Sequence, residues 1–300
     1  MIVAGIDIGT NTVRLIVADI VDGKIKSIIH QNRSVTRLGE DLIKTGYLKD
    51  TAIERTLKVV EQFYREAVSY NVERIKCCAT SAVRESSNGD LFLNHLKEKG
   101  VIVEVIDGEL EGELTCRGVF AGLNVKGYSL IVDIGGGSTE LIYTDGSEVK
   151  TSTSYKIGVV KLADIFDFKG VCDKELFNRA TDYIDDILKE YNFPSLLDNF
   201  IATAGTPTTL AAIDLGFVSY DYRKVNGYEM DKTRIVEILS RISSIPFEER
   251  KGIAGLEAGR EDLIIPGGLI LLYLMNKAGK DKVIVSDFGL REGIAIAATL

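Results

Sequence analysis

Residues 2–15, I-V-A-G-I-D-I-G-T-N-T-V-R-L, return in altered form at residues 130–141 as L-I-V-D-I-G-G-G-S-T-E-L. In each copy an apolar segment leads to an aspartate, a glycine-containing turn, small hydroxyl or amide residues, and a second apolar segment. Two copies of one motif, about a domain length apart, indicate two related halves. The copies match position by position, pairing Asp7 with Asp133, Gly9 with Gly135, Thr12 with Ser138, Arg14 with Glu140, and Leu15 with Leu141.

The bulk composition fits two globular domains and argues against several protein classes. A chain of 300 residues with 45% hydrophobic residues can form two cores. No apolar run reaches the ~18–20 residues that cross a bilayer, and the N-terminus lacks signal-peptide features, so no membrane association is expected. A net charge of −8 argues against broad nucleic-acid binding. Four cysteines without C-x-x-C spacing predict reduced thiols and a cytoplasmic location.

The order of patterns along the chain predicts an α/β fold. An expected three-stranded meander is followed by alternating helices and strands, and Asp50 is expected to cap a helix that runs to about Tyr70. The second half repeats this order. We therefore expect domains at residues 1–123 and 124–300, each a mixed sheet flanked by helices. We expect a final helix at 291–300, which can cross back and pack on the first domain.

Both turns are candidate phosphate-binding loops. Backbone N–H groups in a glycine-rich turn can converge on a phosphate, and neighbouring hydroxyl and amide groups add donors. The alternative is that both are ordinary hairpin turns, which the matched duplication makes less favourable. The candidate phosphate-binding residues are Thr10, Asn11, Gly135, Gly136, Gly137 and Ser138.

Three carboxylates stand beside these turns, namely Asp7, Asp133 and Glu140. A carboxylate next to a phosphate is unfavourable unless a hard divalent cation lies between them, so we expect Mg²⁺, with Mn²⁺ as the alternative. A helix cap or a salt bridge is the competing interpretation, more so for Glu140 than for Asp133.

A third segment of small residues, I-A-T-A-G-T-P-T-T at 201–209, ends an expected strand and begins a helix. Helix N-termini attract anions, so Gly205 and Thr206 are further phosphate-binding candidates. A plain strand-to-helix connection explains this segment equally well.

Six motifs follow one another along the chain: I-D-I-G-T-N-T-V-R-L at 6–15, A-T-S-A-V-R-E-S-S-N at 79–88, D-G-E-L-E-G-E-L at 107–114, D-I-G-G-G-S-T-E at 133–140, A-G-T at 204–206 and G-L-R-E-G at 289–293. Taken together, these motifs resemble the actin, Hsp70 and sugar-kinase superfamily, and within it the exopolyphosphatase and guanosine pentaphosphate phosphohydrolase (Ppx/GppA) family. Three segments depart from the usual family pattern: Leu110-Glu111 stands where two consecutive acidic residues are often found, A-G-T stands where a glycine pair followed by threonine is commoner, and V-N-G at 225–227 lacks a histidine.

The resemblance implies two actin-like (ribonuclease H-like) domains with a cleft between them, and hydrolysis of a terminal phosphoanhydride by water. It assigns the general base to Glu111 and substrate phosphate binding to Arg84 and Arg14. These roles suit the side chains, because a guanidinium matches phosphate oxygens and a carboxylate can accept a proton from water. Without the resemblance, Glu111 would be read as part of a solvated acidic helix face with Glu109 and Glu113.

The implied substrates are inorganic polyphosphate, guanosine pentaphosphate (pppGpp), or both. Two other functions remain open: a phosphotransferase of the same fold, and a noncatalytic sensor of polyphosphate or the alarmone. A homodimer is also left open. A long anionic chain could follow the basic residues Arg14, Arg84, Lys156, Lys161, Arg260 and Arg291, of which only the first two have motif support.

Overall fold

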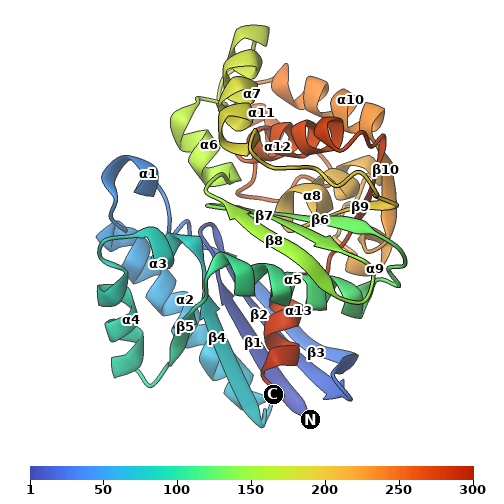
Figure 1. The fold of residues 1–300 in the computed structure, drawn as a ribbon. Helices are drawn as coiled ribbons and strands as arrows, with labels where there is room; N and C mark the ends of the chain where they lie inside the picture. The colour runs from blue at the N-terminus through green and yellow to red at the C-terminus, as the bar shows by residue number, and fades with distance from the viewer. The chain divides into compact units, whose positions relative to one another are not determined.

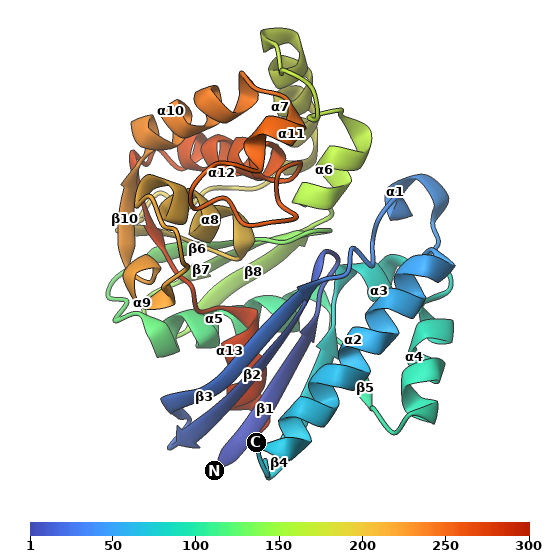
Figure 2. The same cartoon turned by 180° about the vertical axis from the view of Figure 1, so that it is seen from behind.

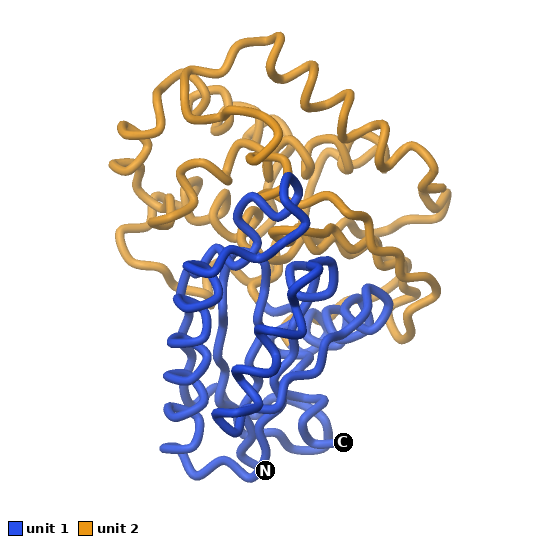
Figure 3. The backbone as a smooth tube through the Cα atoms, turned by 90° about the vertical axis from the view of Figure 1, so that its left-hand side faces the viewer, with its two compact units in different colours: residues 1–121, 288–300 blue, residues 122–287 orange.

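The computed structural model describes residues 1–300, and the chain divides into two compact units (Figure 3). Unit 1 comprises residues 1–121 and 288–300, and unit 2 comprises residues 122–287. The segment after residue 287 therefore returns to the unit that the N-terminus begins. None of the helices combines the length and the apolar character needed to cross a membrane.

Unit 1 is built on a five-stranded sheet with the strand order β3-β2-β1-β4-β5 (Figure 1). Strands β1, β2 and β3 form an antiparallel meander, whereas β4 and β5 run parallel to β1. Its strands are β1 (Ile2–Ile8), β2 (Thr12–Val21), β3 (Lys24–Val35), β4 (Arg74–Ala79) and β5 (Val103–Val105). Its helices are α1 (Leu42–Thr45), α2 (Asp50–Ser69), α3 (Ser81–Glu85), α4 (Gly89–Glu98), α5 (Gly108–Gly122) and α13 (Leu290–Ala297).

Helices cover both faces of this sheet. Successive side chains of a strand point to opposite faces, and β1 carries apolar side chains on both. Ile6 and Ile8 of β1 pack in the cluster that includes Phe63 of α2 and Phe92 of α4. Val3 lies on the other face and packs with Ala295 of α13. Figure 1 shows α5 and α13 on one side of the sheet, and Figure 2 shows α2 on the other.

Helices α5 and α13 approach each other through glycines. A Cβ atom on Gly118 would lie 1.8 Å from the carbonyl oxygen of Gly289, and one on Gly293 would lie 1.9 Å from that of Leu114. No larger residue fits either position without moving a backbone. These contacts fix the course of α5, whose first turn carries Glu111.

Unit 2 has a six-stranded sheet with the order β10-β11-β9-β6-β7-β8. Strands β6, β7 and β8 form an antiparallel meander, β9 and β11 run parallel to β6, and β10 is an antiparallel edge strand. Its strands are β6 (Ser129–Ile134), β7 (Thr139–Thr144), β8 (Val149–Tyr155), β9 (Asn199–Thr203), β10 (Tyr228–Asp231) and β11 (Lys282–Val285). Its helices are α6 (Val159–Ile165), α7 (Lys174–Leu188), α8 (Gly205–Asp214), α9 (Tyr222–Val225), α10 (Lys232–Ser243), α11 (Phe247–Arg250) and α12 (Ile264–Lys277).

The two sheets share one topology, because β3-β2-β1-β4-β5 of unit 1 corresponds to β8-β7-β6-β9-β11 of unit 2. The core of unit 2 gathers around α12, which packs against α6, α7, α8 and α10. Two glycines inside α12 permit this packing, since Gly267 lies against Thr206 and Gly268 against Leu239. The mixed sheets with flanking helices confirm the α/β fold expected from the sequence.

Two expected helix boundaries were wrong. The final helix, expected at residues 291–300, runs from Leu290 to Ala297, and the start of α2 was displaced by a single residue. The N-cap of α2 is Lys49, and Asp50 is the first helical residue rather than the cap. Its carboxylate still lies in the first turn, where negative charge is favourable because of the helix dipole.

Candidate active site

The two duplicated turns have the same backbone geometry. In unit 1, Asp7 lies directly opposite Arg14 across β1 and β2, and the Gly9 amide donates to the Thr12 carbonyl at 3.0 Å. In unit 2, Asp133 lies opposite Glu140, and the Gly135 amide donates to the Ser138 carbonyl at 3.0 Å. Each pair occupies the positions that the sequence repeat aligns. The two turns therefore have the same strand register and the same turn hydrogen bond.

The carbonyl groups of both turns are bound by the segment that follows the meander. In unit 1, the Asn11 carbonyl accepts from the amides of Thr36 at 3.0 Å and Arg37 at 2.9 Å. In unit 2, the Gly136 carbonyl accepts from the Val160 amide at 2.9 Å. This close approach requires Gly158, because a Cβ there would lie 2.4 Å from the Gly136 carbonyl oxygen.

The amides of the turns are left for another partner. The backbone N–H groups of Thr10 and Asn11 donate no hydrogen bond within the protein, and those of Gly136, Gly137 and Ser138 donate none either. A turn whose carbonyls are bound on one side and whose amides make no bond within the protein has amides available to an anion. Both turns can therefore accept a phosphate.

In unit 1, three loops meet at one edge of the sheet, because β1, β4 and β5 are parallel and their carboxyl ends lie together. The Thr80 amide donates to the Ile8 carbonyl at 3.3 Å, and the Ile106 amide donates to the Ala79 carbonyl at 3.0 Å. Helix α3 with Arg84 and helix α5 with Glu111 are thereby placed beside the Gly9 turn.

Arg84 and Glu111 form an ion pair. The Arg84 Nη1 atom lies 2.9 Å from Glu111 Oε2 and donates to the Ile106 carbonyl at 2.7 Å. Glu111 is only 6% exposed, whereas its helix neighbours Glu109 and Glu113 are exposed. The adjacent guanidinium favours the ionised carboxylate, which is the form that accepts a proton. The solvated-face interpretation of Glu111 is therefore wrong.

Arg14 is half-buried on the sheet face that also carries Asp7, and it forms no hydrogen bond or ion pair within the protein. It lies opposite Arg33 across β2 and β3. Directly opposite like charges in a sheet repel each other. An anion near Arg14 would relieve that repulsion.

In unit 2, the same edge of the sheet carries two buried carboxylates. Asp133 and Glu140 face each other across β6 and β7 with exposures of 7% and 1%, and Thr203 lies opposite Asp133 on β9. Glu140 Oε1 accepts from the Ser154 hydroxyl at 2.7 Å. Buried carboxylates this close on one face require positive charge or hydrogen-bond donors nearby.

The residues around both turns suit a hard cation by their chemistry. The side chains of Asp7, Asp133 and Glu140 offer carboxylate oxygens, and the buried carbonyl oxygen Oδ1 of Asn11 has no hydrogen-bond partner. Oxygen ligands are those that Mg²⁺ prefers, and Mg²⁺ usually completes its shell with waters and phosphate oxygens. No group of three or more His, Cys, Asp or Glu side chains is placed to hold a metal by itself.

The segment after β9 lies beside the glycine turn of unit 2, because β6 and β9 are parallel neighbours. Gly205 and Thr206 begin α8 and are buried. The preceding residue, Ala204, has φ +72° and ψ −164°, a backbone region that is essentially confined to glycine. Strain of this kind persists only where the surrounding structure enforces it.

Among the remaining basic residues, Lys161 reaches the unit 2 turn through its backbone, since its amide donates to the Gly136 carbonyl at 3.4 Å, and Arg260 reaches α8 through its side chain. The guanidinium of Arg260 lies against Gly205, where a Cβ would be 1.9 Å from Nη1. Arg291 Nε donates to Glu292 at 2.7 Å, Lys156 is exposed, and Lys161 is buried. Sequence reasoning had no motif for Arg260, which stands 55 positions after Gly205.

The four cysteines are free thiols. Burial raises the pKa of Cys77, Cys78 and Cys116 to about 12, so these thiols remain protonated at neutral pH. None has the lowered pKa that marks a reactive cysteine.

Comparison with known proteins gives a match over nearly the whole chain. The model of the Ppx/GppA phosphatase family matches residues 16–300. The Aquifex aeolicus member of the Ppx/GppA protein family, known from a crystal structure, is 36% identical; the similarity covers 100% of this chain and 97% of that one, with a TM-score of 0.85. These matches show the actin-like fold that the motifs predicted.

Three curated relatives differ in how much of their length is matched. Exopolyphosphatase 2 of Mycobacterium tuberculosis is 30% identical over 98% of both chains. The bifunctional 3-dehydroquinate synthase/phosphatase of Fusobacterium nucleatum is 33% identical over 95% of this chain, which spans 44% of that protein. The guanosine-5'-triphosphate,3'-diphosphate pyrophosphatase of Aliivibrio fischeri is 29% identical over 97% of this chain, which spans 58% of that protein.

Proposed function

Because the chain belongs to the Ppx/GppA phosphatase family, we propose that it removes the terminal phosphate of inorganic polyphosphate, of guanosine pentaphosphate, or of both. The products are inorganic phosphate and either a polyphosphate shortened by one unit or guanosine tetraphosphate. The observation that carries the proposal is the ion pair of Arg84 with the buried Glu111 beside the unit 1 turn.

In the proposed reaction Glu111 is the general base. A water oxygen attacks the terminal phosphorus while Glu111 accepts a proton from that water, and the bridging P–O bond breaks so that the rest of the chain leaves. Arg84 orients Glu111 through the 2.9 Å contact and presents its guanidinium to phosphate oxygens. General base catalysis of this kind contributes about 10²–10⁴ in rate.

The two turns supply the binding groups in this proposal. The amides near Thr10 and Asn11, with Arg14, bind phosphate in unit 1; those of Gly136, Gly137 and Ser138, with Gly135 shaping the turn, bind it in unit 2. Gly205 and Thr206 add the amino end of α8. Such transfer reactions depend mainly on positioning and on charge stabilisation, which these groups provide.

We propose Mg²⁺, or Mn²⁺ in its place, as the cofactor, with Asp7, Asp133 and Glu140 as candidate ligands. When bound, the ion would neutralise phosphate charge. The four free thiols support a reducing compartment such as the cytoplasm. Hydrolysis of guanosine pentaphosphate would connect the protein to the stringent response.

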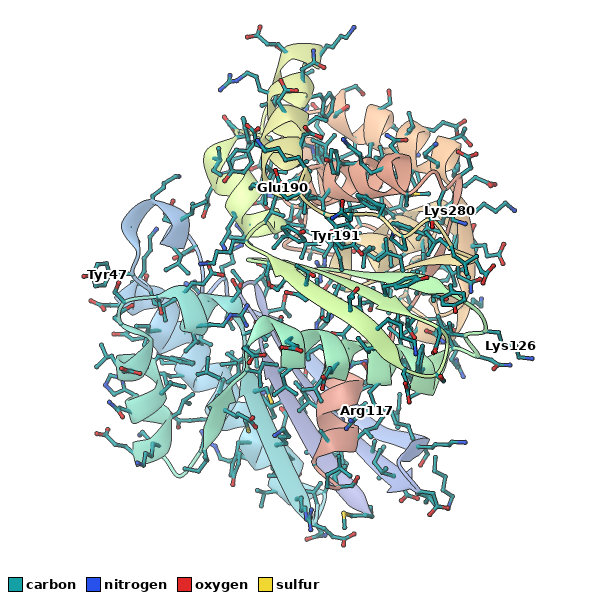
Figure 4. The ribbon with its side chains drawn as sticks, viewed as in Figure 1. Tyr47, Arg117, Lys126, Glu190, Tyr191 and Lys280 are labelled. Atoms are coloured by element: carbon teal, nitrogen blue, oxygen red, sulfur yellow. The ribbon has the colours of Figure 1, made fainter.

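The test is phosphate release from long-chain polyphosphate and from guanosine pentaphosphate, with and without Mg²⁺. We expect metal-dependent release by the wild type and a loss of at least about 10²-fold in kcat for Glu111→Gln. Glu109→Gln and Glu113→Gln are matched controls, because both side chains are exposed on the same helix. Arg84→Gln should also lose activity, whereas Arg117→Gln, an exposed arginine of α5 (Figure 4), should not.

Other outcomes separate the alternative functions. Full activity of Glu111→Gln would remove this residue from the base role. Phosphate transfer to an added acceptor, without release of free phosphate, would identify a phosphotransferase. Binding of either substrate without turnover by the wild type would identify a sensor.

A further inference from the structure

Strand β8 (Val149–Tyr155) is an edge of the unit 2 sheet, and the only strand that pairs with it is β7 (Figure 1). The outer side of an edge strand carries N–H and C=O groups that have no partner in the sheet. Such groups can pair with an extended strand of another chain, a mode of recognition known as β-strand addition.

The other sheet edges have features that discourage such pairing. Strand β3 carries three Lys or Arg side chains and two register irregularities, and β5 and β10 have only three and four residues. Charges, bulges and short length are the usual protection of an edge. Strand β8 has seven residues, no proline and one charged residue, Lys150, whose Nζ lies 2.6 Å from Asp145 Oδ2. Its one irregularity lies at the hairpin end.

The hydrogen-bond register shows which backbone groups of β8 point outward. The ends of the turn between β6 and β7 are hydrogen-bonded to each other, so at the next pair Thr139 directs its N–H and C=O towards β8. Alternate residues of β7 share that direction, and their partners on β8 are Tyr155, Thr153 and Thr151. The backbone groups of Ser152, at the centre of β8, therefore point outward.

The sequence around Ser152 is complementary to an antiparallel copy of itself. Residues 148–156 are E-V-K-T-S-T-S-Y-K, so an antiparallel copy centred on Ser152 places Glu148 opposite Lys156 at both ends of the strand. Opposite charges, apolar residues facing aromatic ones, and pairs of threonines are favourable across strands. The remaining pairs are Val149 with Tyr155, Lys150 with Ser154, and Thr151 with Thr153.

The charged side chains at the two ends are accessible for this pairing. Lys156 is exposed and forms no ion pair within the protein. The side chain of Glu148 is 78% exposed, although its Oε2 lies 3.6 Å from Lys150 Nζ. The hydroxyl residues Thr151 and Thr153 are exposed as well.

We propose that β8 is an interface between two copies of this chain, paired antiparallel about a twofold axis at Ser152, so that their unit 2 sheets join into one. The charge pattern selects this partner and this direction, because a parallel copy would place Glu148 opposite Glu148 and Lys156 opposite Lys156. The twofold axis makes each favourable pair occur twice. A single pair of strands buries less surface than a permanent dimer requires, so the dimer forms as the protein concentration rises.

Sedimentation velocity over a range of protein concentrations measures the dimer dissociation constant. Lys156→Glu sets like charges opposite each other at both ends and should raise this constant at least about tenfold. The double variant Glu148→Lys/Lys156→Glu exchanges the charges and should restore the constant to within about threefold of the wild type. Lys174→Glu is the control for net charge, because Lys174 is exposed on α7 and should leave the constant unchanged.

Disulfide cross-linking tests the register. Thr151 and Thr153 of the second copy form a non-hydrogen-bonded pair in this register, with Cα atoms roughly 4.5 Å apart, which a disulfide can span. In a Cys172→Ser background, a mixture of Thr151→Cys and Thr153→Cys proteins should give a cross-linked heterodimer under mild oxidation, and neither variant alone should cross-link. A wild type that stays monomeric at every concentration, a dimer that Lys156→Glu leaves intact, or cross-linking of either variant alone as efficient as in the mixture would overturn the inference.

Discussion

Replacing Ala204 by glycine should stabilise the protein, although glycine usually destabilises. The native backbone at Ala204 has φ +72° and ψ −164°, and holding a residue with a Cβ in that region costs about 1–3 kcal/mol. Glycine would release this strain. It would also gain about 0.4–1 kcal/mol of conformational freedom in the unfolded chain, which opposes the effect.

The remaining contribution is the lost methyl group, and this is small because Ala204 is only partly buried. The balance is a net stabilisation of about 1 kcal/mol. For a unit of the size of residues 122–287, that corresponds to a rise of about 2–4 °C in Tm. Differential scanning calorimetry of the full chain, together with urea unfolding, measures the change.

Ala212→Gly is the matched control for this prediction. Ala212 lies inside α8, fully helical and buried, so glycine there should destabilise by about 1 kcal/mol or more. A lower Tm for Ala204→Gly, comparable to that of the control, would refute the reasoning. It would mean that Ala204 carries no backbone strain.

Further predictions concern packing, thiols and metal. Gly118→Ala should loosen α13 from α5, because the new Cβ would lie 1.8 Å from the Gly289 carbonyl oxygen. The free energy of unfolding of unit 1 should fall by about 1–3 kcal/mol in urea titrations. An unchanged urea midpoint would contradict the close packing of the two helices. Burial raises the pKa of Cys77, Cys78 and Cys116 from about 9 to about 12. The contribution of these protonated thiols to the free energy of unfolding is therefore complete below the unfolded pKa and is lost as pH rises from about 9 towards 12. Urea midpoints should fall across that range, and less steeply when the three cysteines are replaced by alanine. At pH 8, Cys172, the one partly exposed cysteine, should react first with a thiol reagent, as mass spectrometry of the labelled peptides would show. Chelation with EDTA should abolish phosphate release, and excess Mg²⁺ should restore it; release that persists in EDTA would exclude a metal requirement.

The fold was readable from the sequence because its signal is local and duplicated. The repeat places an aspartate at the end of a buried strand and a residue of the partner strand opposite it, and the structure pairs Asp7 with Arg14 and Asp133 with Glu140 in that register. The α/β class follows from the order of strand and helix patterns. The one-residue displacement at Asp50 is typical of helix ends, where several residues can serve as the cap.

The site was only partly predictable, because its contacts join residues far apart in the chain. The motifs named Arg84 and Glu111 separately, but their ion pair depends on β4 and β5 being parallel neighbours. Without the family resemblance, its neighbours Glu109 and Glu113 would have placed Glu111 on a solvated acidic face, since burial depends on packing rather than on neighbours in sequence. Arg260 carried no local signal, because its partner Gly205 is brought to it by the packing of the segment before α12.

The return of residues 288–300 to unit 1 also affects how the protein is made. Helix α13 packs on β1, β2 and β4, yet it is synthesised only after the whole of unit 2. A nascent unit 1 therefore leaves the ribosome with Val3, Ile16 and Ala18 uncovered on one sheet face, which α13 later buries. Unit 2 is contiguous and can fold as soon as it emerges. Until α13 has left the ribosome, this apolar face of unit 1 is open to chaperones.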